Sequence, residues 1–267
     1  MSPALHPTRP GGPRPQTAPP RTGHRVRTAV AVAVVVLATA ACEWVPTRTF
    51  DATSTPAFSL RYLTRNGTDG YSSGAAAGTV RLAAPSTNQG TNTRLAFYPP
   101  AQPMTVDHQT CATWSDQTDL GTQQGLALRV RNDLPEGRWR AVTVVKNVVW
   151  GANWNLNVLT WDTRDPAGWT TRGSVDLARV FWPGQQLVAL PWRVCARVTG
   201  DLVTVKGWPA GAVEPAWDDP VHTGSVRLPA GWVYAGKGGW YLGHLAPGHR
   251  TTFTDLVLDR LALDTTP

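Results

Sequence analysis

The segment Lys146–Asp162 holds the residues best suited to binding chemistry. Side chains alternate between the two faces of a β-strand, so every second residue here shares a face. One face would carry Asn153, Asn155, Asn157 and Trp161. Amides donate and accept hydrogen bonds, and an indole offers a flat apolar surface. A neutral sugar presents hydroxyl groups and an apolar ring face, so the segment predicts a glycan site. The alternative is a solvent-facing row of asparagines with nothing bound. The opposite face, predicted to meet the core, would carry Trp154, Leu156 and Val158.

Carboxylate placement argues against glycoside hydrolysis, which needs two acidic groups flanking the bond. The chain has three glutamates, Glu43, Glu136 and Glu214, and none is paired with an aspartate along an expected strand. A retaining glycosidase is therefore not favoured. No catalytic residue is assigned, and whether the chain is an enzyme stays open, with a non-enzyme favoured.

Two further kinds of chemistry have weaker signals. The run Tyr234–Tyr241 resembles the Tyr-x-Lys-x-Gly-x-Tyr strand of some polysaccharide lyases, but its spacing differs, and a glycine-rich turn into a core strand is preferred. The histidines lack the spacing of a metal site, so no metal ligand and no cofactor is predicted. Loop carboxylates could still hold a structural calcium; they include Asp116, Asp119, Asp218 and Asp219.

An exported protein is indicated by the apolar run from Ala29 to Ala41, which follows several arginines and ends at Cys42. It is shorter than the roughly 20 residues that span a bilayer, and small residues precede the cysteine. Thr39–Cys42 resembles the bacterial lipobox. Residues 1–41 are thus predicted to be a signal peptide with a long N-terminal extension, and Cys42 to carry lipid on the outer face of the cell membrane. Ordinary cleavage after Ala40 and an uncleaved anchor remain alternatives.

The cysteine count supports this interpretation. The chain has three cysteines, Cys42, Cys111 and Cys195, and an odd number in an exported protein leaves one thiol over. Lipid on Cys42 would remove the odd one. Cys111 and Cys195 are then expected to form a disulfide, which an oxidising compartment would preserve.

The basic charge belongs mainly to the leader. The formal net charge is +7, but five arginines and no acids precede Cys42, which leaves 20 basic and 18 acidic residues after it. No run of basic residues interleaved with aromatics remains, so nucleic acid is rejected as a partner. The 22 arginines against three lysines are typical of a high-GC bacterial genome, such as that of an actinobacterium.

Strand-like segments separated by turn residues recur along the rest of the chain, which predicts one all-β sandwich or barrel. The thirteen tryptophans imply a large core, an aromatic binding surface, or both. The domain is placed at residues 58–263, after a tether at 42–57. The expected strands include Phe58–Leu63, Gly125–Arg131, Trp139–Val149, Gln186–Leu190, Arg193–Val198, Leu202–Lys206 and Thr252–Leu258.

The C-terminal half resembles the laminin-G-like and concanavalin A-like jelly rolls of secreted bacterial proteins. The resemblance covers residues 186–258 and is carried by Leu190–Asp201, Val205–Trp217, Gly239–Gly243 and Thr252–Leu256. It implies a two-sheet antiparallel sandwich, a fold shared by lectins, hydrolases, lyases and inert spacers. The favoured hypothesis is a non-catalytic, lipid-anchored module that binds a glycan or an envelope component. A carbohydrate-active enzyme of the same fold and a structural envelope protein without a small ligand are the alternatives.

Overall fold

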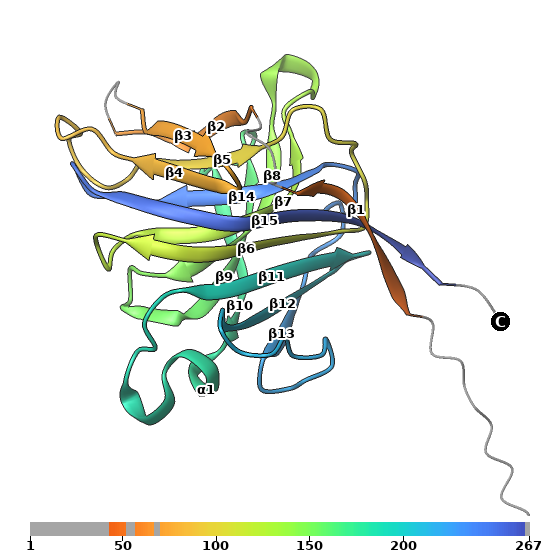
Figure 1. Ribbon diagram of the computed structural model, residues 1–267. Helices are drawn as coiled ribbons and strands as arrows, with labels where there is room; N and C mark the ends of the chain where they lie inside the picture. The colour runs from red at the N-terminus through yellow and green to blue at the C-terminus, as the bar shows by residue number, and fades with distance from the viewer. Residues whose placement is uncertain (1–42, 52–56, 67–69, 265–267) are drawn as a thin grey trace, which may run out of the picture. The chain divides into compact units, whose positions relative to one another are not determined.

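The computed structural model describes residues 43–51, 57–66 and 70–264, and its regular structure is almost entirely β-strand (Figure 1). An eight-stranded sheet contains β13 (Thr223–Arg227), β12 (Leu202–Pro209), β11 (Trp192–Thr199), β6 (His108–Gln117), β15 (Arg250–Leu263), β4 (Thr79–Ala83) and β3 (Ser72–Ala76) in that order, with β1 (Trp44–Asp51) also on β15. A seven-stranded sheet contains β10 (Trp169–Asp176), β9 (Ala152–Asp162), β8 (Arg140–Asn147), β7 (Gln123–Arg131), β14 (Lys237–Gly243), β5 (Arg94–Tyr98) and β2 (Ser59–Thr64).

Every strand pair within the two sheets is antiparallel, and the chain repeatedly passes from one sheet to the other. It crosses between β4 and β5, between β6 and β7, and between β14 and β15. The predicted all-β, two-sheet jelly-roll sandwich of the concanavalin A-like type is therefore confirmed. Helical structure in the described residues consists of α1 (Ala178–Phe181) and the 3-10 turns Pro135–Gly137 and Pro183–Gln185. None of these helices has the length and apolar character needed to cross a membrane.

The core between the sheets follows the two-residue period of the strands. Leu156 and Val158 of β9 lie in this core, as predicted, and Trp154 packs against it. Trp240 and Trp192 are buried there too, and each donates its indole N–H to a backbone carbonyl, that of Cys111 at 2.9 Å and that of Val188 at 3.0 Å. These bonds allow large indoles to be buried without an unmet donor.

A second apolar cluster covers the outer face of the seven-stranded sheet, the face turned away from the core between the sheets. Outer faces of sandwiches are normally polar. This one carries a cluster of buried aromatic and aliphatic side chains instead of a solvated polar surface. Its buried members are Ala96, Tyr98, Ala127, Val130, Trp139, Ala141, Val145, Leu159, Trp161 and Tyr241.

The disulfide between Cys111 and Cys195 is present, as predicted. The two cysteines are directly opposite each other on β6 and β11, with Cα atoms 4.1 Å apart. The bridge lies in a small buried cluster with Trp208, which is also on the eight-stranded sheet.

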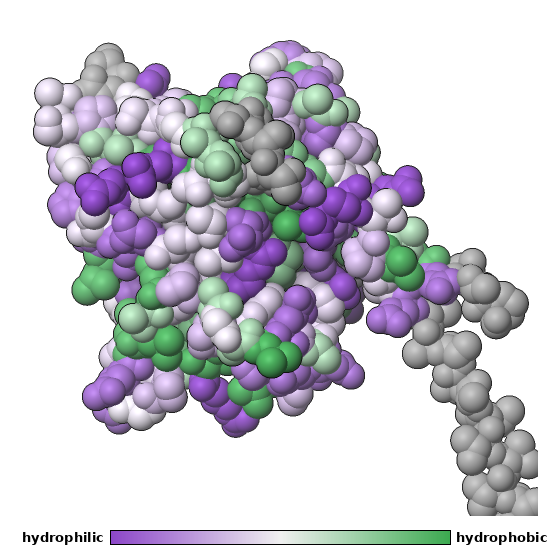
Figure 2. All heavy atoms as spheres, viewed as in Figure 1, coloured by the Kyte–Doolittle hydropathy of each residue, from purple (hydrophilic) through white to green (hydrophobic). Residues whose placement is uncertain are grey.

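Figure 2, viewed as in Figure 1, shows polar and apolar residues mixed over the visible surface.

The structure differs from the sequence prediction at two segments. Trp44–Asp51, placed in the tether, forms β1 because it pairs with the second half of β15 and its Phe50 packs on the core. The expected strand at Gln186–Leu190 is instead a loop, because Leu187 and Leu190 reach the core from an irregular backbone. Cys42 and the predicted signal peptide lie outside the described residues.

Candidate functional site

A hollow of about 320 Å³ lies on the outer face of the seven-stranded sheet. Strands β5, β7, β8, β9 and β10 supply side chains to it, together with the β8–β9 turn and the residue after β14. Its volume is at the lower end of the range typical of small-molecule sites. The lining residues are Arg94, Gln123, Asn147, Val149, Trp150, Asn157, Leu159, Trp161, Trp169, Thr171 and His244.

Two exposed indoles mark the edge of the hollow. Trp150 is 82% exposed and lies in the turn between β8 and β9, where Gly151 adopts a positive φ of 69°. Trp169 is 38% exposed and begins β10. Removing a large aromatic side chain from water is favourable, so exposed rings beside a hollow indicate a contact surface.

Trp161 forms part of the floor and is only 1% exposed. Its ring lies 6.4 Å from the rings of Trp139 and Tyr241 and 6.1 Å from that of Trp169. Its indole N–H donates to Thr143 Oγ1 at 2.9 Å. The Trp161 indole, predicted to offer a flat apolar face to a sugar, is therefore buried instead, because Trp169 of β10, Tyr241 of β14 and Trp139 surround it.

The three asparagines of β9 do not act together. Asn157 lines the hollow with Trp161, whereas Asn153 and Asn155 are not among its lining residues. Asn153 is only 9% exposed, and the buried Oδ1 atoms of Asn153 and Asn155 have no hydrogen-bond partner within the described residues. A solvent-facing asparagine row is thus not what the structure shows.

Arg94 and His244 come together at the β5 side of the hollow. Arg94 Nε donates to His244 Nε2 at 3.2 Å. Burial, helped by the nearby Arg94 charge, lowers the pKa of His244 to about 4, although a hydrogen bond with the Thr91 backbone opposes this. His244 is therefore neutral at pH 7, and its Nε2 can accept the hydrogen bond from Arg94 Nε.

The floor between β7 and β14 is held rigidly. Tyr241 Oη donates to Gln123 Oε1 at 2.6 Å, and Gln123 Nε2 donates to the Lys146 carbonyl at 2.8 Å. Burial raises the pKa of the Tyr241 hydroxyl, which keeps it protonated as a donor. Gly243 leaves the necessary space, since a Cβ there would lie 2.6 Å from Tyr241 Oη.

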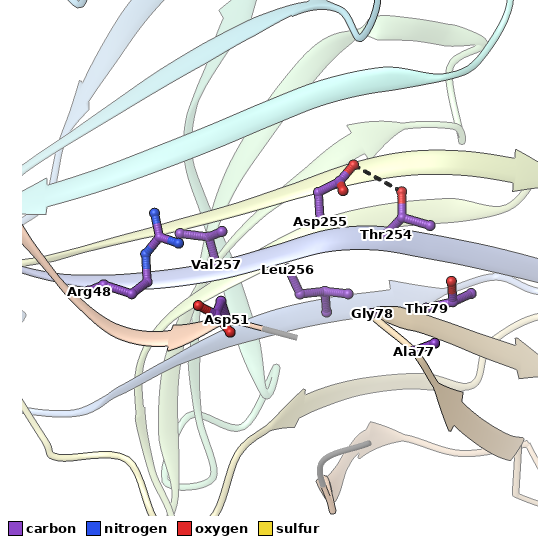
Figure 3. A pocket seen from close by; sticks show the side chains of 9 residues that line it. All are labelled: Arg48, Asp51, Ala77, Gly78, Thr79, Thr254, Asp255, Leu256 and Val257. Atoms are coloured by element: carbon purple, nitrogen blue, oxygen red, sulfur yellow. Dashed lines mark hydrogen bonds between the residues drawn. The ribbon is translucent and has the colours of Figure 1, made fainter. Parts of the chain in front are cut away.

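A larger hollow of about 730 Å³ lies beside the middle of β15, where the register shifts between Thr254 and Val257 (Figure 3). Thr254 donates to Asp255 Oδ2 at 3.2 Å, as the dashed line shows. Its described lining contains no aromatic side chain, unlike that of the first hollow.

The other sequence candidates are dispersed. Glu136 pairs with Arg164, and Glu214 pairs with Lys206, at separate places. Tyr241 is buried in the outer cluster, which fits the interpretation of the Tyr234–Tyr241 run as a turn into a packed strand. Across 43–51, 57–66 and 70–264, no three His, Cys, Asp or Glu side chains gather as a metal site would require.

Comparison with known proteins gives no family. The sequence matches no family model and no curated protein. One solved structure with a similar course of strands is the CBM2 module of the evolved Dit protein of Lactobacillus casei BL23 phage J-1, with 11% identity over 84% of this chain and 100% of that one, and a TM-score of 0.49.

Two further solved structures are similar at about the same level. The exoplasmic/lumenal domain of VIP36, bound to Ca²⁺ and Man3GlcNAc, has 11% identity over 80% of this chain and 90% of that one, with a TM-score of 0.44. A prokaryotic beta-1,3-1,4-glucanase derived from a mouse hindgut metagenome has 8% identity, coverage of 81% and 98%, and a TM-score of 0.44. Likeness at this level assigns no activity, so the function rests on the site itself.

Proposed function

We propose that this protein is a non-catalytic, extracytoplasmic glycan-binding module whose ligand lies in the hollow between Trp150 and Trp169. The observation that carries the proposal is the pair of exposed indoles beside a ligand-sized hollow. Sugar rings stack their apolar faces on aromatic rings, and the Trp169 ring is already held before binding by its place on β10 and its contact with Trp161.

The polar side chains of the hollow suit the rest of a sugar. Asn147, Asn157 and Thr171 line it, and their amides and hydroxyl can both donate and accept hydrogen bonds. Sugar hydroxyls require both functions at once. A floor of fixed aromatic rings with a few polar groups at its margin matches the general composition of small-molecule sites.

Binding without catalysis is favoured by the charges in the hollow. Among the described residues, its lining contains no carboxylate. Glycoside hydrolysis of the usual kind needs two carboxyl groups about 5 to 10 Å apart. A lipid on Cys42, indicated by the preceding small residues and the odd cysteine count, would hold the module on the outer face of the membrane.

The test is a glycan-array screen of the purified full-length protein beside its Trp150→Ala and Trp169→Ala variants. Any glycan bound by the wild type should bind about tenfold or more weakly to each variant, a loss of about 1.4 kcal/mol. Val213→Ala is the matched control, because Val213 is exposed and lies away from the hollow. Binding that survives both tryptophan changes would rule out this hollow as the site.

A further inference from the structure

The hollow has an unbalanced positive charge. Arg94 is the one side chain of its described lining that is ionised at neutral pH, because His244 is neutral there and the other lining residues carry no charge. A neutral-sugar site needs no such group. The arginine therefore gives information about the charge of the ligand, which the aromatic rings do not give.

The contacts of Arg94 are all with neutral acceptors. Its Nε donates to His244, and its Nη1 donates to Thr64 Oγ1 at 3.2 Å and to Asn92 Oδ1. Within the described residues no carboxylate lies within ion-pair distance of Arg94, and the Tyr241 hydroxyl, which also interacts with Arg94 through a side-chain hydrogen bond, is a neutral acceptor as well. A guanidinium has five donors in a fixed plane, so these contacts hold its position but leave its positive charge without a protein counter-ion.

Several arginines of this protein have carboxylate partners, whereas Arg172 and Arg197, like Arg94, donate to neutral acceptors but do not line the hollow. Arg138 and Arg140 both pair with Asp162, and Arg48 pairs with Asp259. A half-buried cation without an anion loses hydration and gains no ion pair in return. An arginine that is held in place by neutral side chains, beside a hollow, is arranged to receive an anion from outside.

We propose that the hollow selects an acidic sugar, one that carries a single carboxylate on its ring, with Arg94 as the counter-ion. The inference rests on the proposed function, since the indoles of Trp150 and Trp169 would hold the ring beside the arginine. One guanidinium matches one negative charge, and its planar donors fit a carboxylate in a two-bond arrangement. A phosphate or sulfate group is the competing source of negative charge and becomes an arm of the test.

The experiment compares glycans that differ only in charge. Oligogalacturonate, an alginate oligosaccharide and a hyaluronan oligosaccharide are each titrated against the full-length protein, beside the same molecules with their carboxyl groups reduced to alcohols. We expect at least one acidic form to bind about tenfold more tightly than its reduced partner, with a preference that shrinks as salt is raised. This comparison uses the wild type, so no variant has to fold.

Variants then assign the preference to Arg94. Arg94→Gln should bind the acidic and reduced forms equally, and Arg94→Lys should keep part of the preference because the charge remains. Arg81→Gln removes the same charge from an exposed residue of β4 and should change nothing. Thermal midpoints of all variants are measured alongside.

The possible outcomes separate the two proposals. Equal binding of acidic and reduced glycans by the wild type, or a preference that survives Arg94→Gln, overturns the acidic-sugar inference and leaves the glycan module intact. Tighter binding of a glycerol phosphate polymer or a sulfated glycan than of every carboxylated one also overturns it. Binding of none of the acidic or reduced glycans, combined with an empty array, overturns both.

Discussion

Trp161 shows how much a single position depends on its neighbours. The ring is surrounded by Trp139, Trp169 and Tyr241, and its N–H is bound to Thr143. We expect Trp161→Ala to lower the free energy of unfolding by about 3 to 5 kcal/mol, because the change leaves a cavity and an unpaired threonine hydroxyl. Chemical denaturation with urea measures this directly.

The control for this prediction is the same substitution at the exposed Trp150. That change should move the unfolding free energy by no more than about 0.5 kcal/mol, as expected of an exposed side chain that packs on little. Equal losses at both positions would mean that Trp150 is part of the packed cluster and that the hollow is formed differently.

At the scale of the elements, the disulfide ties together β6 and β11 in the middle of the eight-stranded sheet. Cys111 and Cys195 are 84 residues apart in sequence and each is only 2% exposed. Replacing both by alanine should cost about 2 to 5 kcal/mol of unfolding free energy, mainly through the greater freedom of the unfolded chain. The measurement is urea denaturation of the variant beside the oxidised wild type.

The rate at which a thiol reagent reduces the disulfide should also depend on whether the surrounding sheet is folded. Trp208 packs against the bridge, so dithiothreitol should reduce it slowly in buffer and quickly once urea unfolds the sheet. Rapid reduction of the folded protein would show that the bridge is accessible and would contradict the packing described.

Strand β9 shows what the alternation of residues in a sequence can predict and what it cannot. Alternation along β9 correctly separates Leu156 and Val158, which face the core between the sheets, from Trp161, which belongs to the outer cluster. Alternation says nothing about what lies over a face. The rings that cover Trp161 come from residues outside β9, and no periodicity within β9 contains them.

At the scale of the whole molecule, the proposed anchor has a direct test. Metabolic labelling with a fatty-acid analogue should mark the wild-type protein and fail to mark Cys42→Ala, because the cysteine thiol is the acceptor of the lipid. Cys111→Ala should be labelled like the wild type, since that cysteine is part of the disulfide. Equal labelling of wild type and Cys42→Ala would remove the anchor.

The jelly-roll sandwich follows from many short strands and turns spread along the chain, so errors such as the loop at Gln186–Leu190 do not change it. The site is less predictable because it is assembled from distant segments. Arg94 and His244 are 150 positions apart and meet only because β14 pairs with β5. Trp150 offered a local signal, since an apolar turn between two strands leaves its side chain outside both sheets.

Strand β1 begins at Trp44, and only Glu43 separates it in sequence from Cys42. One extended residue spans at most about 3.6 Å. With a lipid on Cys42, almost no flexible linker would therefore separate the domain from the membrane. It could pivot at the bilayer surface but could not reach outward through the envelope, so its ligand would have to belong to the cell's own innermost surface layer rather than to a neighbouring cell.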